Sequence, residues 1–376
     1  MGNFLRKTAS SLLWSLCRLL PVQKNKVVLC SAGGRGFGDN PKAIALALLD
    51  KRRDLDLVWL TKNTDASLPE GIRPCRYGSA RAVLELSTAA VWVNDSRGGA
   101  RYKKKRQKYL QTWHGFALKH IEKSAVNLPE HYIEQCKRDS RQIDLLVSGS
   151  AFMTKVYRED FWYDGEIAQF GSPRNDVFFR KTDAGKRVRE FFALPEDRQL
   201  LLYAPTFRDD GSTDCYDIDP EAVLRACERR FGGKWTALLR LHPNAAKLSA
   251  GLFPYNGDTV IDATAYPDMQ ELLQAASLLI TDYSSSMFDY ALSGRPVLRF
   301  APDIRQYQAA RGFYFPLESL PFPLAERSAD LCSMLETFDT AAQQKRWAAF
   351  AEENGFCEDG NASRRCADWI LEKLKG

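Results

Sequence analysis

The sequence lacks the features that mark disulfide-rich, zinc-binding and membrane-spanning proteins. Its nine cysteines form no C-x-x-C pair, and their odd number and scattered spacing argue against a disulfide framework and a zinc site. We find no internal repeat and no low-complexity tract, and no uninterrupted apolar run is long enough to span a bilayer. These absences favour an ordinary globular protein with reduced thiols, as found in the cytoplasm.

Length and composition predict a globular protein with more than one domain. The chain has 376 residues, of which 45% are hydrophobic and 27% charged, so two domains of similar size are expected. The formal net charge of +6 at pH 7 is a mild basic excess. It suits anionic partners such as nucleotides, lipid phosphates or nucleic acids, without choosing among them.

The most apolar stretch is residues 4–20, which also contains basic side chains. An interfacial helix on an anionic leaflet explains this composition, and a helix that packs on the protein body explains it too. A cleavable signal peptide is less well supported, because no small-x-small cleavage site follows. We expect residues 1–25 to form an amphipathic helix at a membrane surface. The leucines on its apolar face are Leu12, Leu13, Leu16, Leu19 and Leu20.

Strands and helices alternate along the rest of the chain, which predicts parallel sheets and an α/β fold. In the first half, short apolar runs at 27–30, 57–60 and 90–93 have the pattern of buried strands. The first helix should begin at Pro41, with Asp39 or Asn40 as its cap. The glycine-rich loop before it does not match G-x-G-x-x-G, so a dinucleotide site has little support.

A dense basic run, RYKKKRQK, occupies residues 101–108. Charge runs of this kind are usually solvated loops. One alternative is a patch for a membrane surface or an anionic acceptor. Nucleic acid is the third choice, since no RNA-binding or helix-turn-helix pattern accompanies the run.

His114 stands where a short strand ends, in the stretch YLQTWHGFALK. Open α/β sheets place ligands at the carboxyl ends of their strands, and Gly115 permits close approach of a substrate. A histidine there could be a general base, because its ordinary pKa lies near neutral pH. The alternative is a structural histidine with satisfied hydrogen bonds. A later strand ends in the polar loop of Arg174, Asn175 and Asp176.

Three successive strands of the second half also end in polar residues. If their sheet is parallel, these ends line one edge of it, and a cation, an imidazole and hydroxyl groups would converge there. Such a set could hold a pyrophosphate. The residues are Thr206 and Arg208, then His242 and Asn244, then Asp282 with Ser284, Ser285 and Ser286.

The three serines precede a short helical pattern within residues 278–300, which ends at Gly294 before another strand. A hydroxyl at a helix start accepts a bond from a first-turn N–H, so ordinary capping explains these residues. The same helix end offers free N–H groups and a positive dipole to an anion. We therefore expect it to contact the phosphates of an activated donor.

Taken together, several stretches resemble the CDP-glycerol glycerophosphotransferases, the family of teichoic acid primases and polymerases. They occur in the family's order and cover nearly the whole chain after the first 25 residues. They are GDNPKAIA (38–45), VNDSR (93–97), QTWHGFALK (111–119), FWYDGEI (161–167), GSPRNDVF (171–178), YAPTFR (203–208), LRLHPN (239–244), TDYSSSMFDYALSGRPVL (281–298), RGFYF (311–315) and EDGNASRR (358–365). The chain departs from the family at Phe116 and Ala117, where Thr-Pro is commoner, and this leaves the identity of the acceptor open.

The resemblance implies a GT-B-like fold, with two Rossmann-like domains whose parallel sheets face a cleft. We expect an acceptor domain at 26–180 and a CDP-polyol domain at 181–376, with the last helix packing back on the first domain. The implied reaction moves glycerol phosphate, or a related polyol phosphate, from CDP-glycerol to a hydroxyl of a lipid-linked or glycan acceptor. CMP is released, with no metal and no cofactor. The setting is biosynthesis of a teichoic-acid-like, capsule or other cell-surface polymer, by a peripheral protein on the cytoplasmic face of the membrane, without nucleic acid.

From the residues and the resemblance together, we expect His114 to be the base and His242 to share the catalysis. The expected donor-binding residues are Thr206, Arg208, Asn244, Asp282, Ser284, Ser285, Ser286 and Asp289, and the expected cleft residues are Gly115, Arg174, Asn175, Asp176 and Arg311. A GT-B nucleotide-sugar glycosyltransferase would instead release a nucleoside diphosphate. A non-catalytic phosphate- or nucleic-acid-binding protein would need the basic run but neither histidine. The choice between glycerol, ribitol and another polyol stays open.

Overall fold

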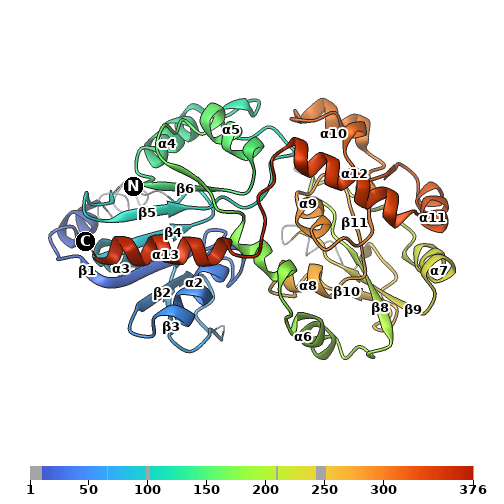
Figure 1. The fold of residues 1–376 in the computed structure, drawn as a ribbon, viewed down its shortest axis with the longest axis horizontal. Coiled ribbons are helices and arrows are strands. Elements are labelled where there is room, and N and C mark those ends of the chain that lie inside the picture. The colour runs from blue at the N-terminus through green and yellow to red at the C-terminus, as the bar shows by residue number, and fades with distance from the viewer. Residues whose placement is uncertain (1–10, 66, 99–101, 209–210, 243–250, 376) are drawn as a thin grey trace. The chain divides into compact units, whose positions relative to one another are not determined.

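The chain folds into two compact α/β units (Figure 1). The structure is a computed structural model, and it describes residues 11–65, 67–98, 102–208, 211–242 and 251–375. The first unit comprises the described residues up to His114, Asn127–Phe179 and those from Phe356 onward. The second comprises Gly115–Val126 and Arg180–Gly355. Both sheets are parallel throughout, which confirms the predicted α/β class.

The first unit is a seven-stranded sheet in the order β3-β2-β1-β4-β5-β6-β7. Its strands are β1 (Gln23–Cys30), β2 (Asp56–Thr61), β3 (Ile72–Arg76), β4 (Ala89–Asn94), β5 (Lys108–Gln111), β6 (Leu145–Ser148) and β7 (Ile167–Gln169). Its helices include α2 (Asp39–Lys51), α3 (Ala80–Thr88), α4 (Glu130–Ser140), α5 (Ala151–Asp160) and α13 (Ala362–Lys375), with the 3₁₀ helix η3 at Pro173–Phe179.

The last helix, α13, covers one face of the first sheet (Figure 1). It packs against α2, and its fully buried Cys366, Ala367 and Ile370 share one hydrophobic core with Val27 and Leu29 of β1. Helix α13 is 14 residues long. A large apolar surface of the sheet is therefore buried only when this helix has docked.

The second unit is a six-stranded sheet in the order β10-β9-β8-β11-β12-β13. Its strands are β8 (Arg198–Tyr203), β9 (Lys234–Leu239), β10 (Val260–Asp262), β11 (Leu278–Thr281), β12 (Val297–Phe300) and β13 (Leu324–Ala325). Its helices include α6 (Ala184–Phe191), α7 (Pro220–Phe231), α8 (Met269–Ala275), α9 (Ser286–Ala291), α10 (Ile304–Ala310), α11 (Ser328–Glu336) and α12 (Thr340–Glu353). The 3₁₀ helices η2 (Glu122–Ser124), η4 (Asp214–Tyr216) and η7 (Leu317–Ser319) belong to the same unit.

Gly115–Val126 packs with the second unit, although the sequence predicted it within the domain at 26–180. The backbone of Lys119 forms an antiparallel bridge with Phe313, and the His120 N–H donates to the Gly312 carbonyl at 2.9 Å. A Cβ at Gly312 would lie 2.2 Å from His120 Nδ1, so only glycine fits there. Phe116 adds an aromatic contact with Phe288, with ring centroids 4.5 Å apart.

Of the helix expected over residues 1–25, residues 11–17 are helical, residues 1–10 lie outside the described residues, and β1 already begins at Gln23. Trp14 stacks on Tyr102 with ring centroids 4.8 Å apart, which fixes the helix to the first unit. Leu12, Leu16 and Leu19 nevertheless remain 62%, 57% and 83% exposed. No helix in the described part of the chain is long and apolar enough to cross a membrane.

Candidate active site

The loop that carries His114 is held by Gln111, at the end of β5, and by side chains from two distant segments. The loop follows β5, and the Trp113 N–H donates to Oε1 of Gln111 at 2.9 Å. Asn40 Nδ2 donates to the Trp113 carbonyl at 2.9 Å, and Arg174 Nη1 donates to the His114 carbonyl at 2.9 Å. These bonds fix a backbone in which Trp113 has a positive φ of 53°, a conformation that costs energy for a bulky residue.

The imidazole of His114 is exposed, and its orientation is set by one hydrogen bond. Its Nδ1 lies 2.7 Å from the backbone carbonyl oxygen of Asp95. A carbonyl oxygen can only accept, so Nδ1 must carry the hydrogen, and in the neutral ring Nε2 then keeps its lone pair. The ring also stacks on Trp113, with centroids 4.2 Å apart. The protein therefore presents a proton-accepting nitrogen to solvent.

Asp95 is held in place by hydrogen bonds that its carboxylate accepts. The side chain accepts from Ser31 Oγ at 2.5 Å and from the Ala32 N–H at 2.8 Å. Burial raises the pKa of this carboxyl group, and the nearby charge of Asp39 raises it further. Ala32 and Asp39 have positive φ values of 46° and 57°, so strained backbone surrounds the His114 loop on several sides.

Asp39 and Asn40 do not have the capping role that the sequence predicted. Helix α2 begins at Asp39, and the preceding Gly38 makes no side-chain cap bond. Asn40 instead accepts from the Arg174 N–H at 2.9 Å, while Asp39 pairs with the Arg174 guanidinium at 2.9 Å. Both side chains therefore connect the start of α2 to the loop that carries Arg174.

Of the expected cleft residues in this unit, Arg174 lies at the His114 loop, whereas Asp176 is turned toward α13. The Asp176 carboxylate accepts from the backbone N–H groups of Ala362 and Ser363, at 2.9 and 2.8 Å. Asn175 is buried and lies 3.4 Å from Glu358. Gly115 follows His114 with φ of 131°, a value that favours glycine.

In the second unit, the ends of β8 and β11 meet as the sequence predicted. The two strands are paired, and the Asp282 carboxylate accepts from the Thr206 N–H at 2.9 Å and from its hydroxyl at 2.6 Å. Asp282 also forms an ion pair with Arg208 at 2.8 Å.

Arg208 is enclosed rather than displayed. Its side chain is 5% exposed and forms a second ion pair, with Asp303, at 2.5 Å. The guanidinium lies over the rings of Tyr283 and Tyr307, at 5.1 and 4.7 Å from their centroids. Burial opposes its charge, but the hydrogen bond to Asp303 and the charge of Asp282 raise its pKa above the usual value. Its positive charge is thus already balanced by two carboxylates.

His242, at the end of β9, is half-buried, and its ring lies 5.7 Å from that of Phe207. Asn244 lies outside the described residues. Ser285 is at the N-cap of α9 and makes no side-chain cap bond, whereas the Ser284 hydroxyl accepts from the Ser286 N–H at the start of the helix, at 3.3 Å. Ser284 and Ser286 join their hydroxyls at 2.9 Å. Asp289 is buried in α9, 3.5 Å from the amide of Gln270.

Lys119 is a cation at this site that sequence reasoning did not select. Its Nζ lies 3.3 Å from the Tyr307 hydroxyl. Burial lowers its pKa to about 8, the charge of Asp282 opposes the shift, and Arg311 and Arg208 favour it. Arg311 itself is exposed, at the end of α10.

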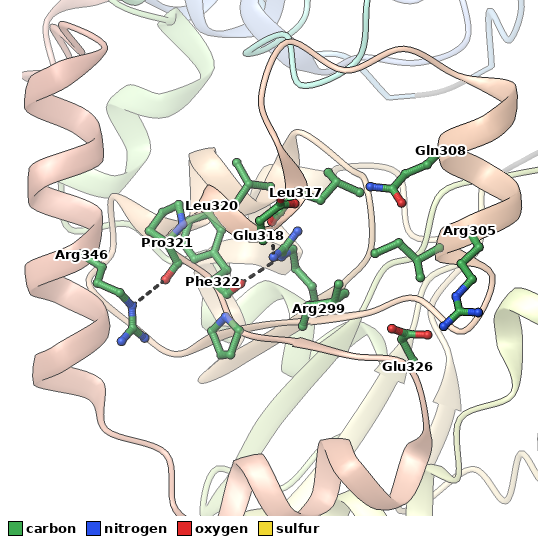
Figure 2. Close-up of a pocket in the computed structure, with 13 residues that line it drawn as sticks. Arg299, Arg305, Gln308, Leu317, Glu318, Leu320, Pro321, Phe322, Glu326 and Arg346 are labelled. Carbon is green, nitrogen blue, oxygen red and sulfur yellow. Dashed lines mark hydrogen bonds between the residues drawn. The ribbon is translucent and has the colours of Figure 1, made fainter.

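Figure 2 shows a separate pocket of about 570 Å³ in the second unit, and none of the expected site residues lines it. Arg299, 2% exposed, donates there to the carbonyls of Phe322 and Leu317 at 3.0 and 2.7 Å. Burial lowers its pKa to about 10. Among the described residues, no group of three or more His, Cys, Asp or Glu could hold a metal ion.

Two parallel α/β units, with a presented histidine in one and polar strand ends in the other, define a protein of the GT-B-like transferase class. The model of the family described as CDP-Glycerol:Poly(glycerophosphate) glycerophosphotransferase matches residues 12–372. The chain belongs to this family.

Relatives and solved structures agree with this assignment. The chain is 32% identical over 375 residues to the teichoic acid poly(glycerol phosphate) polymerase of Staphylococcus epidermidis, covering 94% of this chain and 51% of the polymerase. It is 29% identical to the teichoic acid glycerol-phosphate transferase of Staphylococcus aureus, covering 98% of this chain and 99% of that protein. The chain therefore spans about half the length of some curated relatives it matches.

The structure of the wall teichoic acid polymerase TagF with a histidine-to-alanine substitution superposes with a TM-score of 0.85 at 30% identity, covering 100% of this chain and 99% of that chain. A histidine-to-asparagine variant of the same polymerase was soaked with CDPG and superposes with a TM-score of 0.84.

Proposed function

We propose that the protein transfers glycerol phosphate from CDP-glycerol to a hydroxyl of a poly(glycerol phosphate)-type acceptor and releases CMP. The observation that carries this proposal is the presentation of His114 Nε2, fixed by the bond from Nδ1 to the Asp95 carbonyl. The names of the relatives and the CDPG soak of TagF support the donor.

In the proposed step, the acceptor oxygen attacks the phosphorus that bears the glycerol. A new oxygen–phosphorus bond forms, the bond from that phosphorus to the CMP oxygen breaks, and His114 Nε2 takes the hydroxyl proton. Phosphoryl transfers of this kind need positioning and charge stabilisation more than covalent catalysis. A well-placed base contributes on the order of a hundredfold or more.

The second unit would bind the donor. We assign the pyrophosphate to His242, to the hydroxyls of Ser284, Ser285 and Ser286, and to Arg311, with His242 stabilising the CMP leaving group. Asn244 and Asp289 complete the proposed donor set. Thr206, Arg208 and Asp282 have a supporting role, because their polar groups already bond to one another.

The N-terminal segment supports a place at a membrane surface for a lipid-linked acceptor. Exposed Leu12 and Leu16 lie on a short helix, and Arg18 and exposed Leu19 follow it directly. Lys105 and Arg106, three and four residues after Tyr102, are exposed too. Apolar side chains beside cations favour binding to an anionic leaflet. We propose a peripheral protein on the inner face of the membrane.

The decisive test is CMP release by His114→Ala with CDP-glycerol and a lipid-like acceptor. We expect kcat to fall at least about a hundredfold while the KM for CDP-glycerol stays near wild type. His131→Ala, on the exposed face of α4, is the matched control and should keep full turnover. Near wild-type turnover of His114→Ala would remove His114 from the mechanism, and release of a nucleoside diphosphate from a nucleotide sugar would favour the glycosyltransferase. A panel of CDP-alcohols, scored by CMP release, would choose between glycerol and ribitol.

A further inference from the structure

The first unit contains a largely apolar pocket that the proposed chemistry does not use, although Ser79 and Asn94 also line it. Its volume is about 280 Å³. It lies on the face of the sheet opposite the α13 core, because Val28 and Trp92 alternate along their strands with core residues such as Val27, Leu29 and Val91. Helix α3 contributes Ala82, Val83 and Leu86 to its wall.

Trp14, from the helical residues 11–17, and Tyr102 complete the wall of this pocket. The two rings stack at 4.8 Å, so the N-terminal helix and the basic segment meet at the pocket. Leu12 and Leu16, on either side of Trp14, are 62% and 57% exposed. One helix thus lines the pocket with one residue and displays apolar side chains outside it.

Cations stand where this helix ends. Lys104 Nζ donates to the Leu20 carbonyl at 2.6 Å, and the charges of Arg18 and Lys104 are close enough to repel each other. Lys105 and Arg106 follow in the same loop and are exposed. An anion placed at Arg18 and Lys104 would relieve this repulsion.

We propose that the pocket takes one hydrocarbon chain of an anionic membrane lipid, whose phosphate lies at Arg18 and Lys104. The apolar wall matches the chain, the cations match the headgroup, and the exposed leucines of the same helix would lie among the other chains of the leaflet. This inference rests on the proposed membrane placement, but not on the transfer reaction. A single chain withdrawn into the protein would fix the orientation of the first unit on the surface.

The test uses dodecyl phosphate below its critical micelle concentration, so that neither vesicles nor CDP-glycerol are needed. Isothermal titration calorimetry compares wild type with Val83→Phe, which fills the pocket. Leu84→Phe is the matched control, since Leu84 is also half-buried on α3 but does not line the pocket. We expect Val83→Phe to weaken dodecyl phosphate at least tenfold and Leu84→Phe to change it less than twofold. Butyl phosphate and inorganic phosphate should bind wild type far more weakly than dodecyl phosphate.

A second measurement does not depend on the folding of a variant. Trp14 and Trp92 both line the pocket, so bromine-labelled dodecyl phosphate should quench part of the wild-type tryptophan fluorescence. Unlabelled dodecyl phosphate should reverse the quenching by competition. Equal binding by Val83→Phe and Leu84→Phe, equal binding of butyl and dodecyl phosphate, or absence of quenching would each overturn the proposal. Failure of CMP release or of vesicle binding would instead contradict the proposed function. The dodecyl phosphate titrations would still test the pocket.

Discussion

At the scale of single residues, burial and charge pairing distinguish side chains that support the candidate site from side chains that could react with a substrate. Arg208 is matched by Asp282 and Asp303 and enclosed by two tyrosine rings. Lys119 is partly buried, and burial lowers its pKa to about 8. Of the three side chains, only His114 is exposed. Its Nδ1 bonds to the Asp95 carbonyl, so Nε2 is the nitrogen left to accept a proton.

Replacement of Arg208 by methionine should destabilise the second unit. The change leaves Asp282 and Asp303 buried without their common cation, and breaking a buried ion pair costs about 3–5 kcal/mol. Urea denaturation would measure the loss. Arg327→Met is the control, because its pair with Asp330 lies on the surface and should contribute little. Equal midpoints for the two variants would contradict the supporting role of Arg208.

Lys119 should make stability depend on alkaline pH. Its pKa falls from 10.5 in the unfolded chain to about 8 in the folded protein. Between these values the unfolded chain binds more protons, so stability rises with pH, by roughly 3 kcal/mol in total. The unfolding free energy of wild type, minus that of Lys119→Met, should therefore rise from pH 8 to pH 10.5. Exposed Lys186→Met should show no such trend, and a flat difference for Lys119→Met would contradict its burial.

Sequence reasoning selected His114 and the polar strand ends as candidates because each stands where a predicted strand ends. It did not identify Asp95 or Asn40 as supports of His114, although both stand in stretches that resemble the family. Asn40 contacts Trp113 across 73 positions of sequence, and Asp95 receives the Ser31 hydroxyl across 64. Such partners are fixed by how the strands are ordered in the sheet, which local patterns do not specify.

At the scale of elements, most strands were predicted from short apolar stretches, whereas β3 was not. Strand β3 was missed because IRPCR contains a proline and lies at the sheet edge, where only Ile72 and Cys75 of the strand are buried. Helix α9 was predicted, but it has only six residues, and its first N–H donates to Ser284 rather than to the N-cap residue Ser285. Segment 115–126 was assigned to the wrong unit, because its backbone bonds to residues 312–314 were not visible in its composition.

The helix over residues 11–17 should determine membrane binding through its exposed face. Leu16→Glu places a charge on that face, and we expect at least a tenfold loss of affinity for vesicles that contain phosphatidylglycerol. Co-sedimentation measures it. Leu46→Glu is the control, because Leu46 is also exposed but lies on α2 of the same unit, and it should have little effect. Unchanged binding of Leu16→Glu would remove the helix from membrane contact.

At the scale of the whole molecule, the polypeptide passes between the two units four times, after His114, Val126, Phe179 and Gly355. The first unit is therefore assembled from three separate segments of the chain. The second unit consists of two segments, which residues 127–179 separate. Each unit keeps its own sheet and core.

Deletion of residues 356–376 should unfold the first unit and spare the second. The deletion exposes the sheet face that Cys366, Ala367 and Ile370 cover, and uncovered apolar surface of this kind removes the main stabilisation of a domain. Hydrogen exchange should show lost protection in β1 and β4 and retained protection in β8 and β11. A peptide of residues 356–376 added in trans should restore the former. Full protection of β1 and β4 in the deletion would contradict this role of α13.

The position of α13 has a consequence for folding during synthesis on the ribosome. A ribosome makes the chain from its N-terminus, at about 5–20 residues per second, and early domains generally fold first. Here the earliest strands, β1 to β4, must wait for a helix that begins at Ala362, whereas residues 180–355 can collapse beforehand. Residues 180–355 can thus mature before the strands that are made first, and nascent chains should hold an open, chaperone-accessible sheet until α13 has left the exit tunnel.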